Sequence, residues 1–224
     1  EELEAVIYEE MEALKVDPDF WHEIIFWDGY LPGKDNDKRG QYAAEGMIEY
    51  TPELYRGWVQ YGIWLLTPRV AREWRASSLH RKNWREYFDQ IVEAVDLVHA
   101  EPVLARFWRQ GELVPNRGQR HPFQAAVPEK WRNVHRWFHL NTHLDPESWD
   151  LDQHVPVYTL ARVIGEPGSR QWLVYAHAPM GDRRDVKVTI PDYRMITVDV
   201  PGAGAFYHRK ESDGSLGESE KELR

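Results

Sequence analysis

Two carboxylates stand beside aromatic residues early in the chain, near the end of an apolar run. Asp28 follows Trp27 and precedes Gly29 and Tyr30, and Glu45 lies in the polar stretch that comes after them. Aromatic faces bind the C–H faces of pyranose rings, and a pair of carboxylates supplies the acid and base that glycosidic hydrolysis needs. The pattern therefore predicts Asp28 and Glu45 as catalytic groups that act on a saccharide.

Further side chains in the first sixty residues could bind the same substrate. They are aromatic rings for stacking and polar groups for hydrogen bonding to hydroxyls: Trp27, Tyr30, Trp58, Glu23 and Gln60. Strand alternation places Glu23 and Asp28 on opposite faces, so both reach one ligand only if a bulge intervenes. Asp28, directly before a glycine, is therefore the better catalytic candidate of the two.

Each catalytic candidate also has a purely structural explanation. Asp28 could cap the following loop through its own backbone, as aspartate does in many turns. Glu45 belongs to a series with Glu49 and Glu53, and on a helix this spacing forms a solvated acidic face. The residues alone leave both explanations open.

Three histidines recur every four residues, at His135, His139 and His143. On a helix this spacing aligns three imidazoles, which could bind a metal. Residues 136–140 read better as a strand, where roughly 3.3 Å per residue spreads the three rings apart. We therefore predict no metal site and no cofactor.

Three arginines form a second regularly spaced group, at Arg69, Arg72 and Arg75, with Trp74 among them. A cation–aromatic ladder of this kind could bind an acidic sugar or a phosphate. The alternative is a salt-bridged helix face that includes Glu73. The helix face is the interpretation that the spacing favours.

The overall composition excludes several classes of function. The 224-residue chain has a net charge of −9 and scattered basic residues, whereas nucleic-acid-binding proteins need a basic footprint. It has no cysteine, which excludes disulfides and thiolate metal sites. No apolar run approaches the roughly 20 residues that span a membrane, and no Walker, Rossmann, Gly-x-Ser-x-Gly or His-Glu-x-x-His motif occurs. We predict a soluble protein; the first residues lack signal-peptide features, and the sequence leaves open whether the protein is cytoplasmic or secreted.

The elements that must position the candidate residues alternate between helix and strand in residues 1–118. Hydrophobic periodicity and breaker residues define them. In chain order we expect a helix at 3–15, a buried strand at 21–27, a polar loop at 31–46, a helix capped by Thr51, an ambiguous strand or buried helix at 59–66, a long helix at 83–100 and a short helix at 103–108. This rhythm is typical of an α/β fold, and a loop after the carboxyl end of a strand is where such folds keep their sites.

In the second part of the chain, residues 119–210, the apolar residues recur with a period of two. Short segments rich in β-branched and aromatic residues are separated by turn residues. The expected strands are 136–140, 155–163, 171–177, 186–190, 195–200 and 205–208, followed by a flexible tail at 211–224. Such spacing predicts an antiparallel β-sandwich or small barrel. His177 and His208 fall within these strands and are expected to be packing or surface residues.

Two segments of the second part carry a resemblance to a known family. Residues 171–179 (Gln-Trp-Leu-Val-Tyr-Ala-His-Ala-Pro) and 186–191 (Val-Lys-Val-Thr-Ile-Pro) resemble the accessory β-sandwich that follows the barrel of many (β/α)8-barrel glycoside hydrolases. Residues 27–29 and 55–58 look like strand ends of such a barrel. The resemblance implies a partial (β/α)-barrel-like part, then an all-β sandwich. A full barrel needs about 250 residues, so it also implies a longer enzyme or a smaller α/β fold.

The predicted function is that of a carbohydrate-active protein, a glycoside hydrolase acting on an oligo- or polysaccharide. Two alternatives remain: a non-catalytic carbohydrate-binding or assembly module, and a structural partner of another chain. The partners expected besides the saccharide are the remaining part of a barrel or further copies of the chain. The residues do not define the sugar, the linkage or the stereochemical outcome, which depends on the distance between the two carboxylates.

Overall fold

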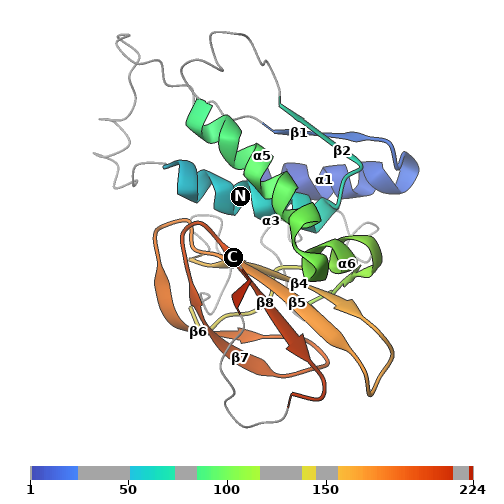
Figure 1. The fold of residues 1–224 in the computed structure, drawn as a ribbon, viewed down its shortest axis with the longest axis vertical. Coiled ribbons are helices and arrows are strands. Elements are labelled where there is room, and N and C mark those ends of the chain that lie inside the picture. The colour runs from blue at the N-terminus through green and yellow to red at the C-terminus, as the bar shows by residue number, and fades with distance from the viewer. Residues whose placement is uncertain are drawn as a thin grey trace.

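The computed structural model describes residues 2–24, 51–73, 85–116, 138–144, 156–213 and 222–223. Helices gather at one end of the molecule and antiparallel sheets at the other (Figure 1). The fold is therefore mixed α/β, as the periodicity predicted, and no sheet in the described residues closes into a barrel. The candidates Asp28, Glu45, Trp27 and Tyr30 lie outside these residues, as does the loop expected at 31–46.

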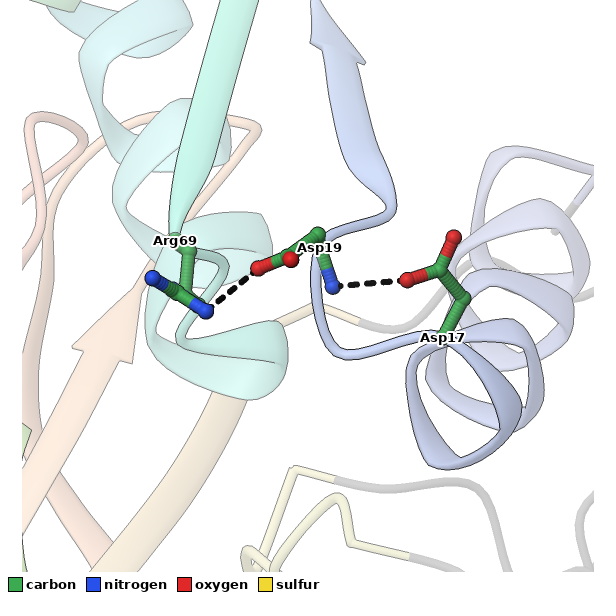
Figure 2. A network of polar contacts seen from close by, with 3 residues as sticks. All are labelled: Asp17, Asp19 and Arg69. Atoms are coloured by element: carbon green, nitrogen blue, oxygen red, sulfur yellow. Dashed lines mark hydrogen bonds and ion pairs between the residues drawn. The ribbon is translucent and has the colours of Figure 1, made fainter.

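The first elements are helix α1 (Glu2–Val16) and strand β1 (Trp21–Ile24). The helix agrees with the prediction for 3–15, and Met11 and Leu14 pack against the core. The break between helix and strand forms around Asp17, whose Oδ1 accepts the Asp19 backbone N–H at 3.0 Å. Asp19 in turn binds the Arg69 guanidinium, which ties this turn to the segment before the next strand (Figure 2).

Strand β2 (Val70–Glu73) pairs in parallel with β1, with Trp21 opposite Val70 and Ile24 opposite Glu73. Helix α3 (Pro52–Leu66) lies between the two strands along the chain. The three elements form a strand–helix–strand unit, because parallel neighbours need a crossover connection. The helix face expected for the arginine series is wrong, since Arg72 lies on a strand.

Helix α3 decides the ambiguity at residues 59–66 in favour of a helix. Thr51 caps its first turn as predicted, with Oγ1 accepting the Leu54 N–H at 3.3 Å, and Pro52 occupies the first helical position. The barrel strand end expected at 55–58 is wrong, because these residues belong to the helix. Most residues of α3 are buried, which explains why no amphipathic stripe distinguished helix from strand.

The carboxyl end of α3 carries a conformational strain that a single substitution should relieve. Thr67, the C-cap, has φ 44° and ψ 54°, a left-handed conformation that β-branched residues rarely adopt. We expect Thr67→Gly to raise the free energy of unfolding by roughly 0.5–1 kcal/mol, because glycine adopts this conformation without steric cost. Urea unfolding measures the change, and Thr51→Ala at the other end of α3 should lower stability by about 1 kcal/mol. A lower midpoint for Thr67→Gly would contradict the prediction.

Helices α5 (Arg85–Ala100) and α6 (Pro102–Gln110) confirm the prediction of a long helix interrupted near Glu101 and Pro102. Glu101 caps α6, with Oε1 accepting the Val103 N–H at 3.4 Å. Helix α5 packs along α3, with Ile91, Ala94 and Val98 buried against it. The helices together form one layer.

The second part of the chain forms two antiparallel sheets. The larger sheet has the order β3 (Glu112–Leu113), β4 (Tyr158–Ile164), β5 (Gln171–His177), β8 (Ala205–Lys210) and β9 (Glu222–Leu223). The smaller sheet pairs β6 (Arg183–Thr189) with β7 (Met195–Val200). The predicted strands at 171–177 and 195–200 are confirmed without a shift. The strand expected at 136–140 is wrong for residues 138–140, although Leu140 N–H donates to the Thr159 carbonyl at 3.1 Å.

The larger sheet is buried on both faces. Along β5, Leu173 and Tyr175 belong to a core shared with the helices, whereas Trp172 and Val174 belong to a core shared with β6 and β7. Alternation along the strand produces this division. The helix-side core contains residues on both sides of residue 118; the domain division expected there stays a prediction.

Candidate functional site

Three of the predicted substrate-binding residues lie in the described part of the chain. Glu23 lies on β1, opposite Arg72 of β2 in the strand register. Trp58 and Gln60 both lie on α3. Two positions along a helix correspond to roughly 200° of rotation, so these two side chains leave α3 in different directions. They consequently take part in two different environments.

Trp58 packs in a cluster of aromatic rings and imidazoles between α3 and the larger sheet. Its ring centroid lies 4.6 Å from that of Tyr158 and 5.5 Å from that of His177. Tyr61 and His139 lie against Tyr158 at 5.5 and 5.9 Å. The Trp58 side chain is therefore engaged in packing at the helix–sheet junction.

His177 is a titratable group of this cluster whose pKa is shifted strongly by burial. Its Nδ1 lies 2.9 Å from the Gly202 carbonyl, a contact that assigns the ring proton to Nδ1. Its Nε2 is buried with no hydrogen-bond partner among the described residues. Burial lowers the pKa of His177 to about 4, and the hydrogen bond to Gly202 opposes this only in part. The imidazole is thus neutral at physiological pH and serves as a packing residue, as predicted.

Helix α3 approaches the larger sheet closely at Gly57, next to Tyr175 and His177. The Tyr175 hydroxyl donates to the Gly57 carbonyl at 2.7 Å. A Cβ atom at Gly57 would lie 2.1 Å from His177 Nδ1. Only glycine fits this position, which explains the glycine within an otherwise large-residue helix.

The neutral state of His177 predicts that stability depends on pH. The pKa of His177 in the folded protein is lowered from its ordinary value of 6.5 to about 4, so the folded state binds fewer protons than the unfolded state between these pH values. The contribution of the neutral His177 to the free energy of unfolding is complete above pH 6.5. It is lost as the pH falls toward 4, by roughly 3 kcal/mol in total. Urea unfolding at several pH values measures it. His177→Asn keeps a donor near Gly202 without a titrating ring, so it should remove this component; an unchanged pH dependence would refute the assignment.

The histidine series does not converge on one point. His139 Nδ1 accepts the Thr159 backbone N–H at 3.1 Å, and His143 Nδ1 accepts the Lys187 backbone N–H at 2.8 Å. His135 lies outside the described residues. Within the described residues, no group of three His, Asp or Glu side chains is arranged to hold a metal ion.

A pocket of about 670 Å³ opens between α3, α5 and the segment that precedes β8. Its lining combines charged, amide and apolar groups from four parts of the chain, namely α3, α5, the turn before β6 and the start of β8: Arg56, Gln60, Glu93, Asp96, Leu97, Ala100, Asp182, Pro201, Ala203, Gly204 and Phe206. The spacing within each helix explains the arrangement, because residues four apart share one helix face. This volume is within the range of roughly 300–1,000 Å³ that is usual for small-molecule sites.

The polar groups of the pocket are held by few contacts. Arg56 Nη1 lies 3.4 Å from Glu93 Oε2 and joins α3 to α5. Asp182 Oδ1 accepts the Gly202 N–H at 2.8 Å. Gln60 is 3% exposed, and its Oε1 has no hydrogen-bond partner among the described residues.

Sequence reasoning selected Gln60 but not the other polar lining residues. Arg56, Glu93 and Asp96 stand at helical spacings that are equally typical of solvated faces. Asp182 joins them only through the packing of the sheet against the helices. No local signal could have identified this group, since it forms across more than 80 residues of chain.

Comparisons with protein-family models, with curated proteins and with solved structures found no match to this chain. Among the described helices, none is both long and apolar enough to cross a membrane. The resemblance to glycoside hydrolases consequently rests on the residues quoted above alone.

Proposed function

We propose that the chain is a carbohydrate-active protein, a glycoside hydrolase with Asp28 and Glu45 as its catalytic carboxylates. The observation that supports this most is the β1–α3–β2 unit, in which parallel strands are joined through a helix. Such units build (β/α)8 barrels, whose catalytic residues follow the carboxyl ends of the strands. Asp28 comes four residues after Ile24, the last residue of β1.

In this proposal one carboxyl group protonates the glycosidic oxygen as the bond to the anomeric carbon breaks. The other acts as nucleophile or as general base toward water, depending on the distance between the two groups. Trp27 and Tyr30 supply stacking surfaces for pyranose rings. Trp58 is not needed for stacking, because its ring is already packed against Tyr158 and His177.

The proposed architecture is a barrel-like α/β part followed by a β-sandwich. The shared core of the larger sheet and the β6–β7 pair supports the sandwich, since two packed antiparallel sheets define that architecture. The parallel β1–β2 pair supports the barrel-like part, because parallel strands usually belong to larger sheets buried on both faces.

A hydrolysis assay with a panel of oligo- and polysaccharides tests the proposal. We expect the full chain to release new reducing ends from at least one substrate. Binding without product release would instead favour a non-catalytic carbohydrate-binding module. Neither binding nor release across neutral, acidic and amino-sugar glycans would contradict a role in carbohydrate chemistry.

A further inference from the structure

We infer that the pocket between α3, α5 and the segment before β8 binds a small molecule that carries an ammonium group. The shared chemistry could come from an aliphatic diamine or from an amino sugar. The inference rests on described residues and does not involve Asp28 or Glu45. It would therefore stand if the hydrolase proposal failed.

The charge of the lining favours a cation. Three carboxylates, those of Glu93, Asp96 and Asp182, face the same space as one guanidinium, that of Arg56. Arg56 lies beside Glu93 at 3.4 Å. Within the described residues Asp96 and Asp182 have no cationic partner. Among the described residues these two negative charges are uncompensated, which favours a cationic ligand over an anionic one.

Gln60 adds a hydrogen-bond acceptor that the described residues leave unused. The side chain lines the pocket and is 3% exposed, yet its Oε1 has no partner among the described residues. A buried carbonyl without a donor is costly, and native structures seldom contain one. Because the terminal torsion of glutamine is soft, the amide can turn this oxygen toward an N–H donor in the pocket. An ammonium group supplies such a donor.

The pocket also fits the rest of such a molecule. Leu97, Pro201 and Phe206 provide apolar surface against which methylene or ring C–H groups can pack. A bare metal ion is a poorer fit, because the described residues contain no group of three acidic or histidine side chains close enough to hold one. The lining instead combines carboxylates with amide and apolar groups, which suits a ligand with several polar groups.

Isothermal titration calorimetry with matched probes tests the inference. The probes are 1,5-diaminopentane and glucosamine, and the neutral controls are 1,5-pentanediol and glucose, all at low salt. We expect the better ammonium probe to bind about tenfold or more tightly than its neutral counterpart. Preference for the diamine would identify an aliphatic amine as the ligand class, and preference for glucosamine an amino sugar. Equal binding of charged and neutral probes, or no binding of any probe, would overturn the inference.

Three variants identify the groups responsible. Asp96→Asn and Asp182→Asn should each weaken binding of the ammonium probe by roughly threefold to fivefold. Glu86→Gln removes the same charge from α5 outside the pocket and should change affinity by less than about twofold. If Glu86→Gln weakens binding as much as Asp96→Asn, the effect is one of net charge and the site is refuted.

Gln60→Met separates a binding role from a structural one. The two side chains have similar length, but methionine removes the buried carbonyl. Binding of the ammonium probe should weaken while the urea midpoint stays equal or rises, because an unpartnered buried oxygen is gone. A lower midpoint with unchanged affinity would show that the amide serves the fold and not a ligand.

Discussion

Replacing Asp28 by asparagine, or Glu45 by glutamine, is expected to lower glycan turnover by roughly 10²-fold or more. Each amide keeps the size of the carboxyl group but can neither donate a proton as an acid nor act as a base or nucleophile. Initial rates of reducing-end release measure the effect. The loss should lie mainly in kcat, because the two groups act on the reacting atoms and not only on substrate binding.

A matched pair of variants distinguishes this role from a solvated acidic face. Glu49→Gln removes a carboxylate from the same glutamate series as Glu45, and Glu86→Gln removes one from α5. Both should keep turnover within about twofold of the unaltered protein. Equal losses for Glu45→Gln and Glu49→Gln would mean that the series acts as a charged surface, and turnover unaffected by Asp28→Asn would remove Asp28 from the site.

The second large effect concerns Arg162, whose side chain is buried at the junction of helices and sheet. Its Nε donates to the Trp64 carbonyl at 2.8 Å, and its Nη1 donates to the Gly111 carbonyl at 2.8 Å. Its Nη2 donates to the Leu65 carbonyl at 3.2 Å. The guanidinium thus satisfies the Trp64 and Leu65 carbonyls at the end of α3 and the carbonyl of Gly111, the C-cap of α6. Helix dipoles favour a positive charge at these carboxyl ends.

Arg162→Met should lower the free energy of unfolding by roughly 2–4 kcal/mol, because the buried carbonyls lose their donors. Replacing both partners of a buried ion pair by apolar side chains is often tolerated. In Arg162→Met only the donor is removed, and the three carbonyl acceptors remain. Burial lowers the pKa of Arg162 to about 10, so the side chain is still charged at neutral pH.

Urea unfolding of a short series checks this expectation. Arg162→Lys keeps the charge without the planar fork and should fall between the unaltered protein and Arg162→Met. A methionine variant within about 0.5 kcal/mol of the unaltered protein would contradict the role assigned to the guanidinium.

The elements that the residues predicted well are those with local signals. Thr51 and Pro52 mark the start of α3, and Glu101 with Pro102 separates α5 from α6. Turns rich in glycine, proline and aspartate flank strands β5 and β7, and these turns define the strand ends. In each case the deciding interaction lies within a few residues of chain.

The elements that the residues left ambiguous or predicted wrongly depend on distant partners. Residues 59–66 are buried on nearly every side, so their pattern contains no polar face to set the period. Strand β2 is only four residues long and exists through its pairing with β1, nearly 50 residues earlier. The segment at 138–140 has the composition of a strand, but separate hydrogen bonds to Thr159, and not a strand ladder, join it to the larger sheet.

The site was predictable only in part, for the same reason. Gln60 was chosen as a polar group near aromatic residues, and its environment proved to be a pocket built with Arg56, Asp96 and Asp182. Arg56 lies on the same helix as Gln60, whereas Asp96 comes from α5 and Asp182 from the turn before β6. Residue types suggested a chemistry, whereas only the packing of α3 between α5 and the sheet assembled these groups.

The larger sheet is covered by the helices on one side and by β6 and β7 on the other, so we expect the molecule to unfold as one unit. Leu173 and Tyr175 face the helices, and Trp172 and Val174 face the smaller sheet. Detachment of either the helices or the smaller sheet would therefore expose apolar side chains of β5 to water. Heating should therefore produce one calorimetric transition and not two. A fragment beginning at residue 119 would expose the helix-facing side of β4, β5 and β8, and we expect it to aggregate when made alone.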